Sequence, residues 1–155
     1  MDTSTLTQHG AEITLTLTKP QIIKDNGSRD HGHWTRNHLG QVRYHDPEGP
    51  RKNSLRHRAW LQGKTLINLN HLTTPVWQHI AVRAHVSYPK GVGRADPGNL
   101  SHTIKPIIDG LTQAGLWPDD DSQHLIGPDY RRDPNQTQPG QWAIRLVITN
   151  LDNQA

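Results

Sequence analysis

Acidic side chains flank one short apolar stretch in the second half of the chain. Asp96 precedes the stretch, in the turn Asp96-Pro97-Gly98-Asn99, and three consecutive aspartates follow it. Mg²⁺ prefers carboxylate, amide and water oxygens, and it usually takes only one or two carboxylates from a protein. Segment 96–121 therefore has the residue types of a magnesium site, which Mn²⁺ could also fill. The candidate metal ligands are Asp96, Asn99, Asp119, Asp120 and Asp121.

The stretch between these acids has the spacing of an amphipathic helix. Thr103 can serve as its N-cap, which puts Pro106 in the first turn, where a proline is tolerated. Gly115 ends the helix in the usual way. The apolar stripe, at a period of 3.6 residues, consists of Leu100, Ile104, Ile107, Ile108 and Leu111.

The length of this helix limits how the acids can meet. A helix of about 12 residues is about 18 Å long, so acids at its two ends cannot share an ion across a straight rod. They converge only if Asn99–His102 loops back along the helix, or if a second subunit supplies one of them. The simpler interpretation of Asp119–Asp121 is an exposed acidic loop.

Lys105 lies on the predicted helix, four residues before Asp109. This spacing puts the two side chains on one face, where a surface ion pair stabilises a helix by only about 0.3–0.5 kcal/mol. If Lys105 instead faces a substrate phosphate, its ammonium group can orient a water molecule or neutralise charge that develops in the transition state.

A polar stretch, 19–53, follows the first predicted strand, and we interpret it as one long basic loop. Between Lys19 and Lys64 there are ten Lys or Arg residues and four acidic residues. Such a segment can bind phosphates in a salt-dependent and largely sequence-independent way. Trp34 could stack on an unpaired base or anchor the loop on the sheet. The candidate DNA contacts are Asn26, Arg29, Trp34, Arg36, Arg43, Arg51, Lys52, Arg56 and Arg58.

Composition narrows the class of protein. The 155 residues suit one domain, and a hydrophobic fraction of 32% predicts a small core that a dimer would help to complete. Without cysteine there are no disulfides or thiolate metal sites, and no helical His-x-x-x-His pair supports zinc. No apolar run approaches about 18 residues, so we expect a soluble, cytoplasmic protein outside the membrane.

The remaining pattern predicts a single compact domain over 1–155, of the α/β (α+β) class. Alternation predicts strands at 12–18, 77–88 and 141–149, with a shorter one at 124–128. A short helix is expected at 54–62. The predicted order is β-α-β-α-β-β, a mixed sheet of about four strands packed by two helices. Four tryptophans are expected in the core or a dimer interface: Trp60, Trp77, Trp117 and Trp142.

About thirty residues resemble the RusA-like Holliday junction resolvases, a family of crossover junction endodeoxyribonucleases. The quoted pattern is Asp96-x-x-Asn99-Leu100, Lys105-x-x-x-Asp109-Gly110-Leu111 and Ala114-Gly115-x-x-x-Asp119-Asp120. The resemblance implies a homodimeric, Mg²⁺-dependent endonuclease that cuts four-way DNA junctions in recombination and repair.

The resemblance also implies roles for single residues. Asp96 and Asp120 match catalytic aspartates, Lys105 matches an active-site lysine, and Asp109 matches a structural acid. Gly98 departs from the pattern, because the founding members have a second catalytic aspartate there. Two other functions stay open: a protein that binds branched DNA without cutting it, and a metal-dependent hydrolase of small phosphorylated molecules.

Overall fold

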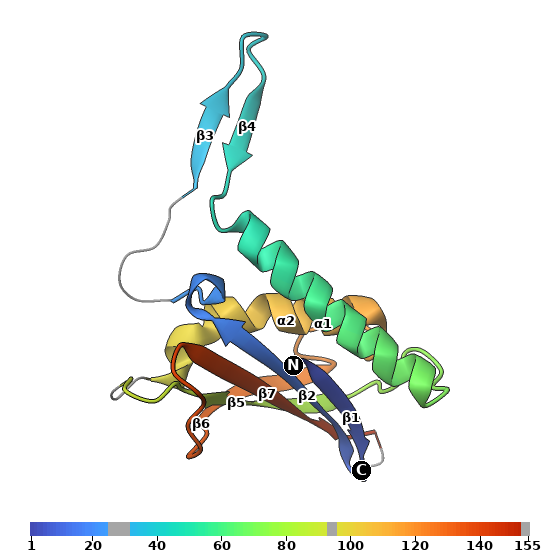
Figure 1. Ribbon diagram of the computed structural model, residues 1–155. Helices are drawn as coiled ribbons and strands as arrows, with labels where there is room; N and C mark the ends of the chain where they lie inside the picture. Colours follow the sequence, from blue (N-terminus) through green and yellow to red (C-terminus); the bar gives the residue numbers. More distant parts are fainter. Residues whose placement is uncertain (25–31, 93–95, 153–155) are drawn as a thin grey trace.

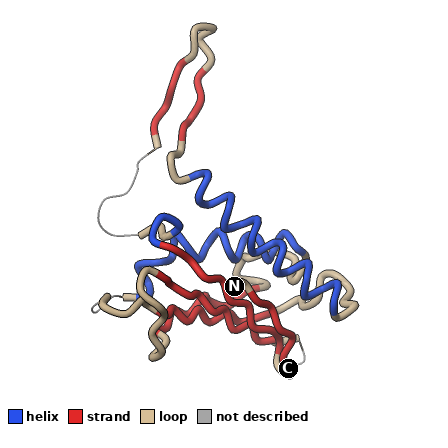
Figure 2. Tube along the Cα trace, in the orientation of Figure 1, coloured by secondary structure: helices blue, strands red, loops and turns tan. Residues whose placement is uncertain are grey.

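Two helices cover one face of a five-stranded sheet, and a narrow two-stranded arm projects beyond them (Figures 1 and 2). The computed structural model describes residues 1–24, 32–92 and 96–152. The helices are α1 (Gly49–Leu69) and α2 (Ser101–Ala114), with two 3-10 helices, η1 (Lys19–Gln21) and η2 (Pro97–Leu100). The strands are β1 (Thr3–Thr7), β2 (Gly10–Thr18), β3 (His33–Arg36), β4 (Val42–His45), β5 (Ile80–Ser87), β6 (Leu125–Arg132) and β7 (Gln141–Asn150).

The main sheet has the strand order β1-β2-β7-β5-β6 and is mixed. The pair β5–β6 is parallel, and the other pairs in this sheet are antiparallel. Alternate residues of β2, β5 and β7 are buried beneath the helices, which is the result of a two-residue side-chain period. The α+β class and the predicted order of the core elements are confirmed, with β2, α1, β5, α2, β6 and β7 following in that sequence.

The two helices pack closely because glycines lie at their crossing. A Cβ at Gly63 of α1 would lie 2.7 Å from Cβ of Ala114, and a Cβ at Gly110 of α2 would overlap the backbone carbonyl of Arg56. Gly63 therefore continues α1 instead of ending it, and α1 is longer at both ends than the predicted 54–62. Gly110 is one of the residues that resemble the RusA-like family, and in this structure its lack of a side chain allows the two helices to approach each other.

The prediction of one long loop over 19–53 is wrong. This stretch contains η1, the two strands of the arm and the first turn of α1. We define the arm as residues 33–45, that is β3, β4 and the turn between them. All eight strand residues of the arm are exposed, so no alternation of apolar residues marks it in the sequence. The edge strand β1 was missed for the same reason, since its five residues include a single apolar one.

The predicted start of the second helix is also wrong. Helix α2 begins at Ser101 and continues from η2, and Pro106 lies in its second turn. Thr103 is no N-cap: its buried hydroxyl donates to the carbonyl of Ile23 and accepts from the Ile23 amide, both at 2.8 Å. Thr103 thus ties the segment after η1 to the beginning of α2.

The core between the helices and the sheet contains most of the predicted tryptophans. Trp77, Trp117 and Trp142 are buried, whereas Trp60 is half-buried and stacks on His57. Neither helix in 1–24, 32–92 and 96–152 combines the length and the apolar character needed to cross a lipid bilayer.

Candidate active site

Lys105 lies between two aspartates that come from different parts of the chain. Its Nζ donates to Oδ1 of Asp109, one turn along α2, at 2.8 Å. It also donates to Oδ2 of Asp120, fifteen residues later in the sequence. Because α2 ends at Ala114, segment 115–120 must run back beside the helix for Asp120 to reach this ammonium group, which also contacts Asp109.

The return along the helix is therefore made after α2, not before it. Asn99–His102 does not loop back, because it passes from η2 directly into α2. The turn starts at Gly115, the C-cap, whose φ of 101° lies in the left-handed region that favours glycine. Gly115 and Leu116 then accept backbone hydrogen bonds from Val76 and Trp77.

Buried side chains fix the path of this return. Leu116 and Trp117 are almost completely buried in the core. The indole Nε1 of Trp117 donates to Oγ1 of Thr112 at 2.7 Å, which attaches the segment to the last turn of α2. These contacts turn the chain back along α2, and the hydrogen bond from the Lys105 ammonium then holds Asp120 beside the turn that carries Asp109.

The neighbouring aspartates have local structural partners. Oδ1 of Asp119 accepts from the backbone amide of Asp120 at 2.7 Å, and Oδ1 of Asp121 accepts from the amide of Gln123 at 3.0 Å. Both side chains lie on exposed residues at the turn that leads into β6. Of the three consecutive aspartates, Asp120 is the one that bonds to Lys105.

The contact between Lys105 and Asp120 holds both groups in their charged forms. Burial alone would lower the pKa of Lys105, but hydrogen bonds to Asp109 and Asp120 outweigh it and raise this pKa above the ordinary 10.5. The hydrogen bond from Lys105 is the largest cause that lowers the pKa of Asp120 below 3.8, against the effect of burial. Lys105 is thus an ammonium ion at neutral pH and has no free base to accept a proton.

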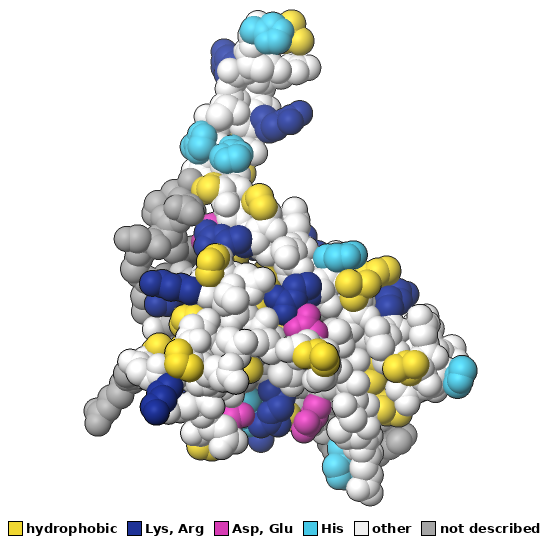
Figure 3. Space-filling model, in the orientation of Figure 1, with side chains coloured by type: hydrophobic (Ala, Val, Ile, Leu, Met, Phe, Trp, Pro, Cys, Tyr) yellow, Lys and Arg dark blue, Asp and Glu magenta, His cyan; other side chains and the backbone are white. Residues whose placement is uncertain are grey.

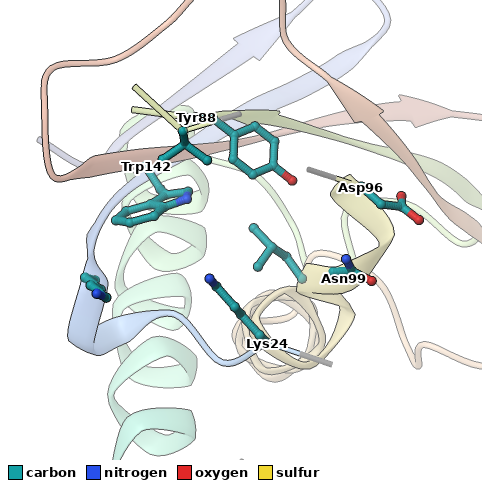
Figure 4. Close-up of a pocket in the computed structure, with 8 residues that line it drawn as sticks. Lys24, Tyr88, Asp96, Asn99 and Trp142 are labelled. Carbon is teal, nitrogen blue, oxygen red and sulfur yellow. The ribbon is translucent and has the colours of Figure 1, made fainter. Parts of the chain in front are cut away.

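Asp96 and Asn99 lie at η2, which precedes the N-terminus of α2. Asp96 is the N-cap of η2, and its Oδ1 accepts from the amide of Gly98 at 2.9 Å. In Figure 4 the polar ends of Asp96 and Asn99 point to the same side of η2, away from Lys24. A Cβ at Gly98 would lie 3.3 Å from Oδ1 of Asp96, so a carboxylate at position 98 would stand beside that of Asp96.

The donor set can be compared with what Mg²⁺ requires. In residues 1–24, 32–92 and 96–152, no three Asp, Glu or His side chains gather into a metal-binding group, so the predicted five-ligand set is not brought together. One or two carboxylates with waters suffice for Mg²⁺, however, because substrate phosphates complete its shell. Asp96, Asp120 and the amide of Asn99 fit this requirement in number and in chemical type.

Three of the predicted DNA contacts lie on the arm, and they are exposed there. The indole of Trp34 packs edge-on against the ring of Tyr44, with centroids 5.2 Å apart. Trp34 is 71% exposed and Tyr44 is 52% exposed, so both rings remain open to solvent. Arg36 and Arg43 are exposed on the same two strands, and Figure 3 shows Lys or Arg side chains along the arm and at its base.

Three of the other predicted DNA contacts already have polar or charged partners within the chain. Lys52 pairs with Asp46 at 3.1 Å, Arg51 with Glu48 at 3.9 Å, and Arg56 donates to Asn53 at 2.7 Å. These three basic residues lie on α1, near the base of the arm. Two further residues, Asn26 and Arg29, fall outside the described residues.

The guanidinium of Arg58 is engaged in contacts within the protein, and its charge is not presented to solvent as part of a basic surface. Its guanidinium donates twice to the carboxylate of Asp2, at 2.6 and 2.9 Å, and once to the carbonyl of Thr16 at 2.8 Å. A fork-shaped pair of this kind attaches β1 and β2 to α1. We therefore leave Arg58 out of the proposed DNA surface.

Sequence reasoning missed Tyr44 and the residues that surround the pocket beside Asp96, namely Lys19, Lys24 and Tyr88. The arm left one signal in the sequence, the turn Asn37–Gly40. Oδ1 of Asn37 accepts from the amides of Leu39 and Gln41, and Gly40 has a φ of 79°. The pocket left none, because its walls come from segments that are far apart in the sequence. No protein-family model matches the chain, and no curated protein matches it in sequence.

Proposed function

We propose that this chain is a Mg²⁺-dependent, structure-selective endonuclease that cuts four-way DNA junctions. The observation that carries the proposal is the return of Asp120 to Lys105, because it brings an acid from beyond α2 to a lysine near the start of that helix. Asp96 stands at the entrance to the same helix. Carboxylates along one helix, together with a permanent cation, are the residue types that suit the hydrolysis of a phosphodiester, and the proposal requires Asp96 and Asp120 to share one ion.

Each side chain has a role in this chemistry. Asp96 and Asp120, with the amide of Asn99, would hold the metal, and bound Mg²⁺ would lower the pKa of a water molecule and stabilise the leaving oxygen. Lys105 cannot act as a base, because its pKa is raised. It would instead neutralise charge on the phosphate, while Asp109 keeps its ammonium group in position.

The arm would make the contacts that select branched DNA. Trp34 and Tyr44 offer exposed aromatic faces, and unpaired bases at a branch point can stack on such faces. Arg36 and Arg43 would neutralise phosphates on either side, which makes binding salt-dependent. The basic residues Arg51, Lys52 and Arg56 would continue this surface along α1.

Two symmetric cuts in a four-way junction require two sites related by a two-fold axis. We therefore propose a homodimer, in which each protomer supplies one site. Its action on DNA in recombination and repair would take place in the cytoplasm.

Synthetic four-way junctions test the proposal. Wild-type protein with Mg²⁺ should cut the junction and leave a linear duplex of the same sequence intact. Asp120→Asn should bind the junction as the wild type does and lose cleavage by about 100-fold or more. Asp129→Asn is the matched control. Asp129 pairs with Arg131 on β6 and is not among the proposed site residues, so this variant should retain full activity. Failure of the wild type to bind branched DNA at low salt would refute the proposal.

Gly98 favours a second candidate, a protein that holds branched DNA without cutting it. The neighbour of Asp96 that would carry a second carboxylate has no side chain. Binding without cleavage, in both wild type and Asp120→Asn, would select this second function.

A further inference from the structure

A pocket of about 270 Å³ opens next to Asp96, where β5 ends and β7 begins. Figure 4 shows the side chains that surround it. Besides Asp96 and Asn99, it is lined by Tyr88, Val92, Leu100 and Trp142 and by two lysines, Lys19 and Lys24. Pockets for drug-sized ligands start at about 300 Å³, so this one suits a group no larger than a single nucleotide.

Tyr88 gives the strongest sign of a ligand. The residue is only 4% exposed, and its buried hydroxyl has no hydrogen-bond partner within residues 1–24, 32–92 and 96–152. The guanidinium of Arg132 lies over the ring, 4.6 Å from its centroid, and holds the ring in place. A buried polar group without a hydrogen-bond partner lowers the stability of the fold. The unpaired hydroxyl of Tyr88 is therefore explained if a ligand accepts its hydrogen bond.

The hydroxyl of Tyr88 is available as a donor. Burial raises its pKa, Asp96 raises it further, and Arg132 opposes both. The group thus stays protonated at neutral pH. In Figure 4 it points toward the side of the pocket formed by η2.

Trp142 forms a flat wall next to Tyr88. In the antiparallel pair β5–β7, Ser87 stands opposite Ala143, so the next residues along, Tyr88 and Trp142, are neighbours across the two strands. Trp142 is 7% exposed and Leu100 is 3% exposed. A planar ring in the pocket would have the indole of Trp142 for one face and the aliphatic side chain of Leu100 for the other.

Two lysines supply positive charge at this pocket. Lys19 and Lys24 are exposed, and Figure 4 shows the side chain of Lys24 extending toward Trp142. No ion pair joins either ammonium group to a carboxylate of the described residues. Lysine binds phosphate as a point charge, so the pocket combines an aromatic wall, one buried donor and two cations.

We propose that this pocket binds one unstacked nucleotide, with the base against Trp142 and the phosphate at Lys19 and Lys24. The Tyr88 hydroxyl would donate a hydrogen bond to an acceptor atom on the edge of the base. In the endonuclease, and resting on the proposed function, this is the nucleotide next to the phosphate that is cut. Asp96 and Asn99 stand at the rim, so a base turned into the pocket brings the adjoining phosphate to these candidate metal ligands.

Mononucleotides test the pocket without any need for cleavage. The four deoxynucleoside 5′-monophosphates are titrated into the protein at millimolar concentration while the indole N–H resonance of Trp142 is followed by NMR. Binding should shift this resonance, whereas deoxyribose 5-phosphate, which lacks a base, should leave it in place. The absence of a shift with all four nucleotides would overturn the proposal.

Two variants separate the contributions of hydroxyl and charge. Tyr88→Phe should weaken mononucleotide binding by about 3–10-fold, since it deletes one hydrogen bond. The same variant should raise Tm by about 2–4 °C, because the unpartnered hydroxyl is gone. Lys24→Ala should weaken the binding of nucleotides but not of nucleosides, and Tyr130→Phe is the tyrosine control. Affinity equal to wild type in both pocket variants would overturn the proposal.

Junctions then link the pocket to cleavage. A 2-aminopurine placed next to the cut should change fluorescence on binding to wild type, and the change should be smaller with Tyr88→Phe. If junctions are cut equally well by both proteins with no fluorescence change, the pocket proposal fails while the endonuclease stands. If mononucleotides shift Trp142 but junctions are neither bound nor cut, the nucleotide site stands and the proposed function fails.

Discussion

The carboxylate of Asp120 accepts a hydrogen bond from the ammonium group of Lys105, fifteen residues earlier in the chain and on the other side of a helix end. Asp109 holds the same ammonium group from within α2. The pair therefore joins the acidic segment after α2 to the second turn of that helix. This contact is the basis of the mechanism proposed above.

Replacement of Lys105 should separate its chemical role from its structural one. Lys105→Met should reduce junction cleavage by about 100–1,000-fold, because it removes a cation aimed at the developing charge. The ammonium is mostly exposed, so the free energy of unfolding should fall by only about 0.2–1 kcal/mol. Lys105→Arg keeps the charge and should retain part of the activity. Cleavage by Lys105→Met at the wild-type rate would contradict this role.

The pair should be insensitive to pH over a wide range. The folded-state pKa of Asp120 is lowered, so its contribution to stability is present above its ordinary pKa of 3.8 and is lost as pH falls through the lower folded value. The folded-state pKa of Lys105 is raised, so its contribution is present below 10.5 and is lost as pH rises through the higher folded value. The difference in unfolding free energy between wild type and Lys105→Met should therefore be constant from about pH 5 to 9. A change of this difference near neutrality, measured by urea unfolding, would show that the pair titrates there.

Gly98→Asp should strengthen the metal site. A carboxylate at position 98 would stand beside Asp96, as the 3.3 Å approach of a Cβ to its Oδ1 indicates. Without metal the two negative charges should repel each other and lower Tm; with Mg²⁺ the loss should be reversed. Cleavage at low Mg²⁺ concentration should rise relative to wild type. Gly98→Asn, similar in shape but uncharged, is the matched control and should show neither effect on metal dependence.

The arm should contribute to DNA affinity and hardly to folding. Trp34→Ala should weaken junction binding by about 5–100-fold, the effect of losing one base stacked on an aromatic ring. Its Tm should stay close to that of wild type, since the residue is 71% exposed. Leu69→Ala is a suitable control, because Leu69 is 74% exposed and ends α1 at the opposite end from the arm. Equal losses of affinity in the two variants would argue against a specific role for Trp34.

Sequence patterns predicted the parts of the fold that are buried on one side. Strands β2, β5 and β7 alternate between core and solvent, and α2 carries a continuous apolar stripe, so their periods are visible in the sequence. The arm has no buried face, and the edge strand β6 carries exposed charges over its second half, where the prediction stopped short. An element without a buried face gives no period to detect.

The candidate site was predictable in composition but not in geometry. The residue types of Asp96, Lys105 and Asp120 were evident from the chain. The direction of the return was not, because it depends on the burial of Leu116 and Trp117 in a core formed by other segments. The pocket beside Asp96 lay beyond sequence reasoning for a similar reason.

The most direct test is the position of a bound ion. Crystals of the protein grown with Mn²⁺ should give one anomalous peak within bonding distance of carboxylate oxygens from both Asp96 and Asp120, in one protomer or across a dimer. Asp120→Asn crystals should lose that peak or show it weakened. Mn²⁺ bound by neither aspartate, or by one of them far from the other, would contradict a shared metal site and with it the proposed endonuclease.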